Sequence, residues 1–308
     1  MEDESQTTPP GANASRDRVP ANRVVVLGSL NVDHTVWVDQ LPTRGETLLA
    51  RAYSVTLGGK GLNQAITAAR QGADVHMVGC VGEDPEGALI LATLADEGVE
   101  VAHIRHHAEL PTGRAQITVD GEGGNTIVVV PGANMAVDFP SAALEAADVL
   151  LVQLECPLEV VVAALSAARS AGVVTVLNPA PALPLAPEML ALVDYLVPNQ
   201  HEARVLGIED LSPGTGTLIV TRGAEGAFVR KGGREKWLPP LPVDRVVDPT
   251  GAGDAFCGTL AAGLASGDPF GVVLNRAAAA GAHAVTIAGA LPSLPDIKQV
   301  DALLASTG

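Results

Sequence analysis

Short apolar runs alternate with alanine- and leucine-rich segments along most of the chain. The apolar runs have the length of strands and contain few polar residues, which is typical of strands buried on both faces. The segments between them repeat apolar residues at helical spacing. This alternation predicts an α/β fold, with a mostly parallel central sheet and helices on both faces. The expected strands are 23–27, 75–78, 149–154, 173–177, 195–197 and 218–220, and the expected helices include 63–71, 86–97, 158–171 and 276–288.

Two stretches with weak helical signals interrupt the alternation. Residues 34–57 place Val36 and Val38 at alternate positions before a second apolar stretch, and residues 112–131 contain a hairpin pattern around a polar glycine turn. We expect these stretches to form a small β-sheet lid over a pocket at the carboxyl ends of the main strands. Two decorative surface hairpins are the alternative. The α/β domain then comprises 23–33, 58–111 and 132–308, and the polar segment 1–22 is expected to be a disordered tail.

Composition argues against several classes of protein. The 308 residues are 47% hydrophobic, enough for a sizeable core, and the net charge of −16 argues against a nucleic-acid partner because phosphate binding requires clustered lysine and arginine. No apolar run approaches the ~20 residues of a membrane span, and the N-terminus lacks the apolar core of a signal peptide. Cys80, Cys156 and Cys257 lack metal-ligand spacing, so we expect free thiols in a cytoplasmic protein.

The segment 248–257, Asp-Pro-Thr-Gly-Ala-Gly-Asp-Ala-Phe-Cys, carries the strongest chemical signal. Gly251, Ala252 and Gly253 place backbone N–H groups directly before a predicted helix, where unpaired donors and partial positive charge suit an anion. Asp254 follows in the first turn of that helix. A carboxylate beside an anion hole suits phosphoryl transfer to a hydroxyl, because one group takes the proton and several stabilise the charge. An ordinary glycine turn capped by an aspartate is the alternative.

Two further motifs occur nearer the N-terminus. Asn31 and Asp33 are two residues apart, so their side chains share one face of an extended segment and can bind vicinal hydroxyls of a sugar; an Asx turn is the alternative. In the segment 57–63, Leu-Gly-Gly-Lys-Gly-Leu-Asn, glycines permit close approach of a ligand, while Lys60 and Asn63 add a charge and an amide. Neither this segment nor the one described above contains a P-loop or a dinucleotide fingerprint.

Single polar residues mark the ends of other predicted strands. Glu155 follows one strand, and Asn199 and Glu202 follow another, where a carboxylate can hold water on a magnesium ion. The glycine turn after the strand 218–220 suits the approach of a phosphate or a ribose; it contains Thr221, Gly223 and Gly226. Each signal is weak alone, but their joint occurrence at strand ends is hard to explain by turns.

Taken in order, these segments resemble the ribokinase-like carbohydrate kinase family, also called the phosphofructokinase-B type. The resemblance extends from about residue 23 to residue 293. Asp-Pro-Thr-Gly-Ala-Gly-Asp is similar to the family's C-terminal signature, and Gly-Gly-Lys-Gly-Leu-Asn to its N-terminal one. The segments that most resemble family members acting on ribose are Gly28-Ser-Leu-Asn-Val-Asp33, Gln153-Leu-Glu155 and Asn178-Pro-Ala-Pro181. The resemblance implies an ATP-dependent kinase that phosphorylates the 5-hydroxyl of D-ribose and uses Mg²⁺ with ATP.

The resemblance also implies roles for individual residues. Asp254 is the implied catalytic base, with the amides of Gly251, Ala252 and Gly253 as the anion hole. The implied sugar ligands are Asn31, Asp33, Gly58, Gly59, Lys60, Asn63, Glu155 and Asp254. The implied nucleotide contacts are Asn199, Thr221, Gly223, Gly226 and Gly253, with Glu202 tied to Mg²⁺ through water. A potassium site, for K⁺ as a monovalent activator, is implied at Asp248, Thr250, Ala284, Ile287, Gly289 and Ser293.

Two departures from the family pattern affect the nucleotide side. The segment 203–220 is short, and Ala278 stands where some relatives carry a larger, ring-bearing side chain near the base. A kinase for nucleosides or another sugar, a non-catalytic sugar or nucleotide sensor and, more weakly, a dinucleotide-dependent reductase are the alternatives. A nucleoside pocket is disfavoured because few aromatic residues lie near the lid beyond Trp37 and Tyr53. The resemblance and the lid together predict a homodimer formed through the lid.

Overall fold

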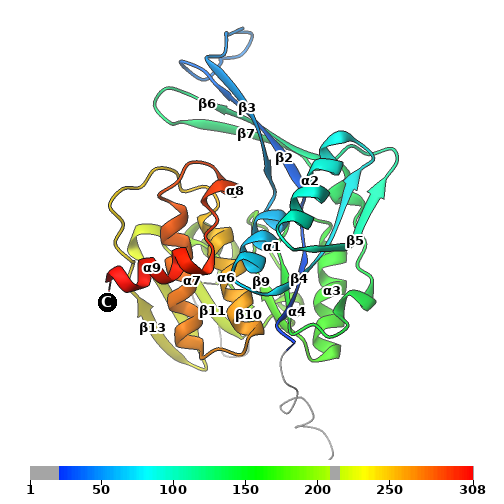
Figure 1. The fold of residues 1–308 in the computed structure, drawn as a ribbon, viewed down its shortest axis with the longest axis vertical. Coiled ribbons are helices and arrows are strands. Elements are labelled where there is room, and N and C mark those ends of the chain that lie inside the picture. Colours follow the sequence, from blue (N-terminus) through cyan, green and yellow to red (C-terminus); the bar gives the residue numbers. More distant parts are fainter. Residues whose placement is uncertain (1–20, 209–215, 308) are drawn as a thin grey trace, which may run out of the picture.

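The computed structural model describes residues 21–208 and 216–307 and contains a nine-stranded sheet covered by helices (Figure 1). The strand order is β13-β12-β11-β10-β9-β8-β1-β4-β5. The strands span Arg23–Leu27 (β1), Asp74–Gly82 (β4), Glu100–His107 (β5), Val149–Val152 (β8), Val174–Leu177 (β9), Tyr195–Leu196 (β10), Thr217–Thr221 (β11), Ala227–Lys231 (β12) and Arg234–Leu238 (β13). The sheet is parallel from β5 to β11, and β12 and β13 continue it as antiparallel strands. The predicted mostly parallel α/β fold is therefore confirmed.

Strand β1 shows why both faces of the sheet are covered. Val24 and Val26 belong to one apolar cluster, whereas Val25 and Leu27 belong to a second one, because successive side chains of a strand point to opposite faces. The helices whose side chains join the first cluster are α1 (Lys60–Arg70), α2 (Pro85–Asp96), α6 (Ala252–Ala265), α7 (Phe270–Ala284) and α9 (Ile297–Thr307). Those that join the second are α3 (Leu158–Ala171), α4 (Pro187–Leu190) and α5 (Gln200–Leu206).

A separate four-stranded sheet projects from the α/β body (Figure 1). Its order is β3-β2-β6-β7, and the strands span Asn31–Trp37 (β2), Ala52–Gly58 (β3), Gly113–Val119 (β6) and Asn125–Val130 (β7). Strand β2 pairs antiparallel with β3 and parallel with β6, and β6 forms an antiparallel hairpin with β7. We call this sheet the lid. It begins at Asn31 rather than at residue 34, so Asn31 and Asp33 lie on a lid strand.

Several element bounds differ from the prediction. Helix α7 begins at Phe270, directly after Pro269, and ends at Ala284, so it is displaced toward the N-terminus relative to 276–288. The predicted strand 149–154 ends at Val152. Strands β5, β12 and β13 were not predicted. Strands β5 and β13 are the two edge strands, and their sequences, such as Glu-Val-Ala-His-Ile-Arg-His-His in β5, are rich in charged or polar residues, while β12 is a short strand, Ala-Phe-Val-Arg-Lys, next to the edge.

Two sequence expectations concern segments that lie wholly or partly outside the described residues. The expected disordered tail lies there apart from Ala21 and Asn22, and so does the middle of the short segment 203–220. Within 21–208 and 216–307, no helix has both the length and the apolar character needed to cross a bilayer.

Candidate active site

The polar residues that follow β1 and β8 lie close together. They lie at the point of the sheet where the connections that leave two neighbouring strands run in opposite directions. Strands β1 and β8 are neighbours, but the chain continues from β1 toward β4 and from β8 toward β9, on opposite sides. Such a point in a parallel sheet leaves a crevice at the carboxyl ends of the strands, where ligands bind. Ser29 donates a hydrogen bond to Glu155 Oε2, and the Lys60 amide donates to the same oxygen at 3.1 Å. These two bonds join the ends of β1, β8 and α1.

Asp33 lies against the glycines that precede α1. A β-carbon on Gly58 would lie 2.2 Å from Asp33 Oδ2, so only glycine leaves space for this carboxylate. Gly59 is the N-cap residue of α1, and Lys60 is the first residue of that helix. The lid strand that carries Asp33 is thereby brought beside the N-terminus of α1.

Asp254 lies in the first turn of α6 and is 7% exposed. Its Oδ2 accepts a hydrogen bond from Asn63 Nδ2 at 3.0 Å, and its Oδ1 accepts one from Gln64 Nε2 at 2.9 Å. Helix α6 reaches α1 because residue 258 is a glycine: a β-carbon there would lie 2.6 Å from the Gln64 carbonyl oxygen and from Thr67 Cβ. This close helix contact brings Asp254 to the N-terminal end of α1.

The amides at the start of α6 are available to a ligand. Gly251 has a φ of 82°, a left-handed conformation that glycine adopts without strain, and it precedes the helix. The N–H groups of Gly251, Gly253 and Asp254 have no hydrogen-bond acceptor among the described residues, whereas the Ala252 N–H contacts the Pro249 carbonyl at 3.3 Å. A β-carbon on Gly253 would meet nothing within 4 Å. Unpaired amides facing open space at a helix N-terminus suit an anion.

The charged groups of the site shift one another's pKa values. Burial raises the pKa of Asp33 to about 6, and the Glu155 carboxylate adds to the increase. The Asp254 carboxylate raises the pKa of Lys60 against the opposing effect of burial, and Glu155 and Glu202 act in the same direction. At neutral pH, Lys60 is therefore an ammonium group that is stabilised electrostatically by carboxylates from three different segments.

Sequence reasoning missed a layer of buried amides beneath these residues. Gln153 Nε2 donates to Gln64 Oε1 at 2.6 Å, Gln64 donates to Asn178 Oδ1 at 3.1 Å, and Asn178 donates to the Val197 carbonyl at 3.0 Å. This chain of bonds fixes the Gln64 amide that holds Asp254. The signal was present, since Gln153 and Asn178 are polar residues at the ends of apolar strands.

Asn134 is a further residue that sequence reasoning missed. It is buried in the short 3₁₀ helix Gly132–Ala136, where it donates to Asn31 Oδ1 at 2.8 Å and accepts from the Leu30 amide at 2.9 Å. Asn31 is therefore held in place by a residue far away in the sequence. No local motif marks Asn134.

The residues expected to contact the nucleotide form a second group. Asn199 and Glu202 make a reciprocal capping box at the start of α5: Asn199 Oδ1 accepts from the Glu202 amide, and Glu202 Oε2 accepts from the Asn199 amide, both at 2.8 Å. Burial raises the pKa of Glu202, while the Asn199 amide and the Lys60 charge oppose the increase. Thr221 ends β11 and pairs with Asn199, and the turn that follows contains Gly223 and Gly226.

The residues expected to bind potassium surround a turn beside α6. Asp248 Oδ1 accepts hydrogen bonds from the amide of Thr250 at 2.9 Å and from its hydroxyl at 2.6 Å, and Oδ2 accepts one from the Gly289 amide at 2.8 Å. Burial alone would raise the pKa of Asp248, but these hydrogen bonds together lower it. The Ala284 carbonyl receives the Ile287 amide at 3.3 Å, and the buried Ser293 hydroxyl donates to the Ala290 carbonyl at 2.7 Å. The turn thus gathers a carboxylate and several carbonyl groups.

Comparison with known proteins gives a consistent result. The pattern of the family described as pfkB family carbohydrate kinase matches residues 21–297. The ribokinase of Haemophilus influenzae is 38% identical over 291 residues, which cover 88% of this chain and 95% of that protein. The ribokinase of Bacillus subtilis is 38% identical over 292 residues, covering 91% and 99%. The structure of Arabidopsis thaliana ribokinase complexed with ribose and ATP has a TM-score of 0.84 and 32% identity, covering 93% of this chain and 99% of that one.

The chain therefore belongs to the pfkB family of carbohydrate kinases. This confirms the resemblance identified from the two glycine motifs, and with it the expected fold, a parallel α/β body with a separate small sheet.

Proposed function

We propose that this protein is an ATP-dependent kinase that transfers the γ-phosphoryl group to the 5-hydroxyl of D-ribose. The observation that carries the proposal is the meeting of Asp254, the acceptor-free amides at the start of α6, and the sugar-side residues Asp33 and Lys60. The relatives named ribokinase, at 38% identity over most of their length, support ribose as the substrate.

The sugar would be bound between the lid and the start of α1. Asn31 and Asp33 offer an amide and a carboxylate from one face of β2, and Glu155 and Lys60 offer a second carboxylate and an ammonium from the opposite wall. Gly58 and Gly59 let the backbone approach, and Asn63 links the start of α1 to Asp254 through its hydrogen bond to that carboxylate. Several polar groups in fixed positions can hydrogen-bond several hydroxyl groups of one sugar, and this favours a sugar over a ligand that lacks those hydroxyls.

Asp254 would act as the base in an in-line transfer. A carboxylate is a weak base toward a free alcohol, so the proton would leave late, once the bond from the sugar oxygen to the γ-phosphorus is forming. That oxygen–phosphorus bond forms, the bond from the γ-phosphorus to the bridging oxygen breaks, ADP leaves with the electron pair, and the proton passes to Asp254. The amides of Gly251, Ala252 and Gly253 would stabilise the developing charge; of these, Gly251 and Gly253 have no competing acceptor in the described chain.

Mg²⁺ would arrive with the nucleotide rather than occupy a protein cage. Within the described ranges, no three His, Cys, Asp or Glu side chains are grouped as metal ligands. This fits Mg²⁺ bound mainly by phosphates and water, with Glu202 as a partner through water. Asn199, Thr221, Gly223 and Gly226 would line the nucleotide side, and Gly253 would approach its phosphates.

Potassium would be held at the turn beside α6. Asp248, whose lowered pKa keeps it ionised, and the neighbouring oxygen groups of Thr250, Ala284, Ile287, Gly289 and Ser293 are chemically suited to a monovalent cation. Its charge would stabilise the segment that carries Gly251 and Gly253. The expected result is a higher rate with K⁺ than with a large organic cation at equal ionic strength.

We also propose that two copies associate through their lids, in the cytoplasm. All six residues of the edge strand β7 are exposed, and Ile127, Val128, Val129 and Val130 form a continuous apolar run on it. An exposed apolar edge strand favours association. Cys80, Cys156 and Cys257, all buried free thiols, are compatible with a reducing compartment. Sedimentation of the full chain, with Val128→Lys as a disrupting variant, tests the dimer.

A screen of ATP consumption tests the proposed activity. The full chain is assayed with ribose, deoxyribose, fructose, adenosine and other nucleosides, with and without K⁺. Ribose-dependent ADP formation far above that with nucleosides is expected, and ribose 5-phosphate is the expected product. A nucleoside as the best substrate would replace the proposal with a nucleoside kinase. Binding of ribose without turnover of any acceptor would indicate a sensor.

A further inference from the structure

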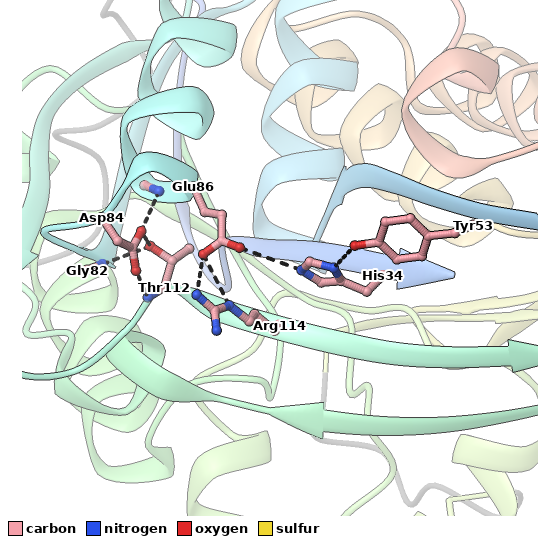
Figure 2. Close-up of polar contacts among 8 residues, drawn as sticks. His34, Tyr53, Gly82, Asp84, Glu86, Thr112 and Arg114 are labelled. Atoms are coloured by element: carbon pink, nitrogen blue, oxygen red, sulfur yellow. Dashed lines mark hydrogen bonds and ion pairs between the residues drawn. The ribbon is translucent and has the colours of Figure 1, made fainter. Parts of the chain in front are cut away.

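A cluster of polar side chains joins the lid to the N-terminus of α2 (Figure 2). Glu86 lies in the first turn of α2, where the helix dipole favours a carboxylate. Arg114 of β6 donates to Glu86 Oε2 through Nε at 3.1 Å and also through Nη2. His34 of β2 places Nε2 3.6 Å from Glu86 Oε1, and its Nδ1 shares a hydrogen bond of 2.7 Å with the Tyr53 hydroxyl of β3. One carboxylate of the α/β body therefore contacts two lid strands.

These contacts are partly sheltered from solvent. The side chains of His34, Glu86 and Arg114 are 17%, 24% and 36% exposed. His34 Nε2 is buried and makes no hydrogen bond within the described chain, so Glu86 is its electrostatic partner there. The charge-assisted contact between Arg114 and Glu86 is stronger than a fully exposed ion pair.

The cluster lies behind the lid face that carries the sugar-side residues. Asn31 and Asp33 share one face of β2, and the intervening positions, including His34, point to the other face. Arg114 pairs in register with Val32, and Tyr53 with Val36, so both side chains lie on the His34 face. Glu86 thus holds the lid from the side opposite Asp33.

A second contact holds the beginning of β6 beside the same helix. Asp84, the N-cap of α2, accepts hydrogen bonds from the Thr112 amide at 2.8 Å and its hydroxyl at 2.6 Å (Figure 2). The next residue, Gly113, lies so close to Asn31 that a β-carbon on it would be 2.2 Å from Asn31 Oδ1. Displacement of β6 from α2 would therefore displace Asn31.

We propose that Glu86 is a positioning residue for sugar binding: through Arg114 and His34 it anchors the lid to α2 and sets where Asn31 and Asp33 lie relative to Lys60 and Asp254. This inference rests on the proposed sugar-kinase function of the same site. Asp254 and the anion-hole amides belong to the α/β body, not to the lid. Loss of the anchor weakens sugar binding and leaves the chemical step nearly intact.

Asp74 provides a matched control. Its carboxylate also contacts one arginine and one histidine, Arg23 at 2.7 Å and His76 at 3.4 Å, but at the start of β4, the opposite end of the sheet from the site. Asp74→Asn therefore removes the same kinds of charge contact, from a more exposed carboxylate, without touching the lid. Comparison with this variant separates the effect of losing the contact between Glu86 and the lid from the general effect of losing an ion pair.

The experiment compares Glu86→Gln, Arg114→Gln, their double variant and Asp74→Asn in the full chain. For Glu86→Gln we expect the KM for ribose to rise about 5- to 30-fold, with kcat within about twofold of wild type. Arg114→Gln should behave similarly, and the double variant no worse than the more impaired single one, because the two residues act as a unit. Hydrogen exchange of 31–37 and 113–119 should accelerate in these variants, whereas Asp74→Asn should match wild type in both measurements.

The inference is overturned if Glu86→Gln matches Asp74→Asn in KM and in exchange, or if kcat falls as much as KM rises. Failure of the proposed function gives a different result. Wild type would then not phosphorylate ribose at all, while the exchange of 31–37 and 113–119 would still report whether Glu86 anchors the lid.

Discussion

The proposed sugar side and the proposed nucleotide side of the candidate site are built differently. On the sugar side, Asp254 receives hydrogen bonds from two side-chain amides of α1, and a further layer of buried amides holds one of them, that of Gln64, in place. On the nucleotide side, the exposed Asn199 is bonded mainly to its neighbour Glu202, and the turn at Gly223 is exposed. The sugar side is preorganised by long-range contacts, whereas the nucleotide side consists of local motifs.

This difference indicates where specificity resides. Buried polar groups that have fixed partners reject a ligand that cannot pair with them, because the groups would be left unsatisfied. Exposed turns offer backbone groups that tolerate more variation in the ligand. Substitutions on the sugar side should therefore have larger and more selective effects than substitutions on the nucleotide side.

Asp254→Asn should have the largest effect. We expect kcat to fall roughly 10³- to 10⁴-fold, because the proton acceptor is lost. Affinity for ribose should change little, since the Asn63 amide can rotate and offer its unpartnered Oδ1 to the new amide group. Steady-state rates and calorimetric titration with ribose measure the two quantities. Near-normal turnover would remove Asp254 from the mechanism.

Asp33→Asn should chiefly affect sugar binding. The KM for ribose should rise about 10- to 100-fold, because a charged acceptor for hydroxyl groups is lost. In wild type, kcat/KM for ribose should increase as the pH rises through about 6, where Asp33 ionises, and the variant should lack this increase. A profile that is the same in both proteins would contradict the assignment.

The same substitution should stabilise the ligand-free protein. Between the ordinary pKa of 3.8 and the raised value of about 6, the folded state binds the Asp33 proton more tightly than the unfolded state does. Stability therefore falls as the pH rises through this range, and at pH 7 the variant should gain about 1 kcal/mol. Urea unfolding at pH 4 and pH 7 measures the difference. A variant less stable than wild type at pH 7 would show that the buried Asp33 charge does not destabilise the folded protein.

Asn199→Ala should have a moderate effect limited to the nucleotide. Loss of the capping box costs about 1 kcal/mol of helix stability and loosens the start of α5. We expect the KM for ATP to rise about three- to tenfold while the KM for ribose stays unchanged. Two-substrate kinetics distinguish these effects. An equal increase in both KM values would mean that the two sides are not independent.

Gly223→Ala should have the smallest effect. Gly223 has a φ of 53°, so alanine costs about 1 kcal/mol of local strain, but its β-carbon would meet nothing within 4 Å. We expect the KM for ATP to change about twofold to threefold, with an unchanged KM for ribose. Complete loss of ATP use would instead show that this backbone touches the phosphates as closely as the amides of α6 are proposed to do.

Much of the fold could be predicted from local pattern. Helix α3 spans the predicted residues Leu158–Ala171, and strand β1 spans Arg23–Leu27 as predicted, because both have apolar periodicity and clear ends. Strand β5 was missed because its polar sequence lacks the signal of a buried strand. The two glycine motifs marked the candidate site, but Gln64, Asn134 and Gly258 were not singled out, since each acts on a residue from another part of the chain.

The amino-acid sequence alone determined the α/β alternation, the lid segments and the identity of the acidic, basic and glycine-rich motifs, because these depend on neighbouring residues and short periodicities. The resemblance already implied that Asp33, Lys60, Glu155 and Asp254 share one site, but only the tertiary structure showed that Gln64 bonds Asp254, that Asn134 bonds Asn31 and that Glu86 contacts the lid. That arrangement depends on the order of the strands, on the register of the lid strands and on the distance between α1 and α6. Contacts between segments that are distant in the sequence determine all three.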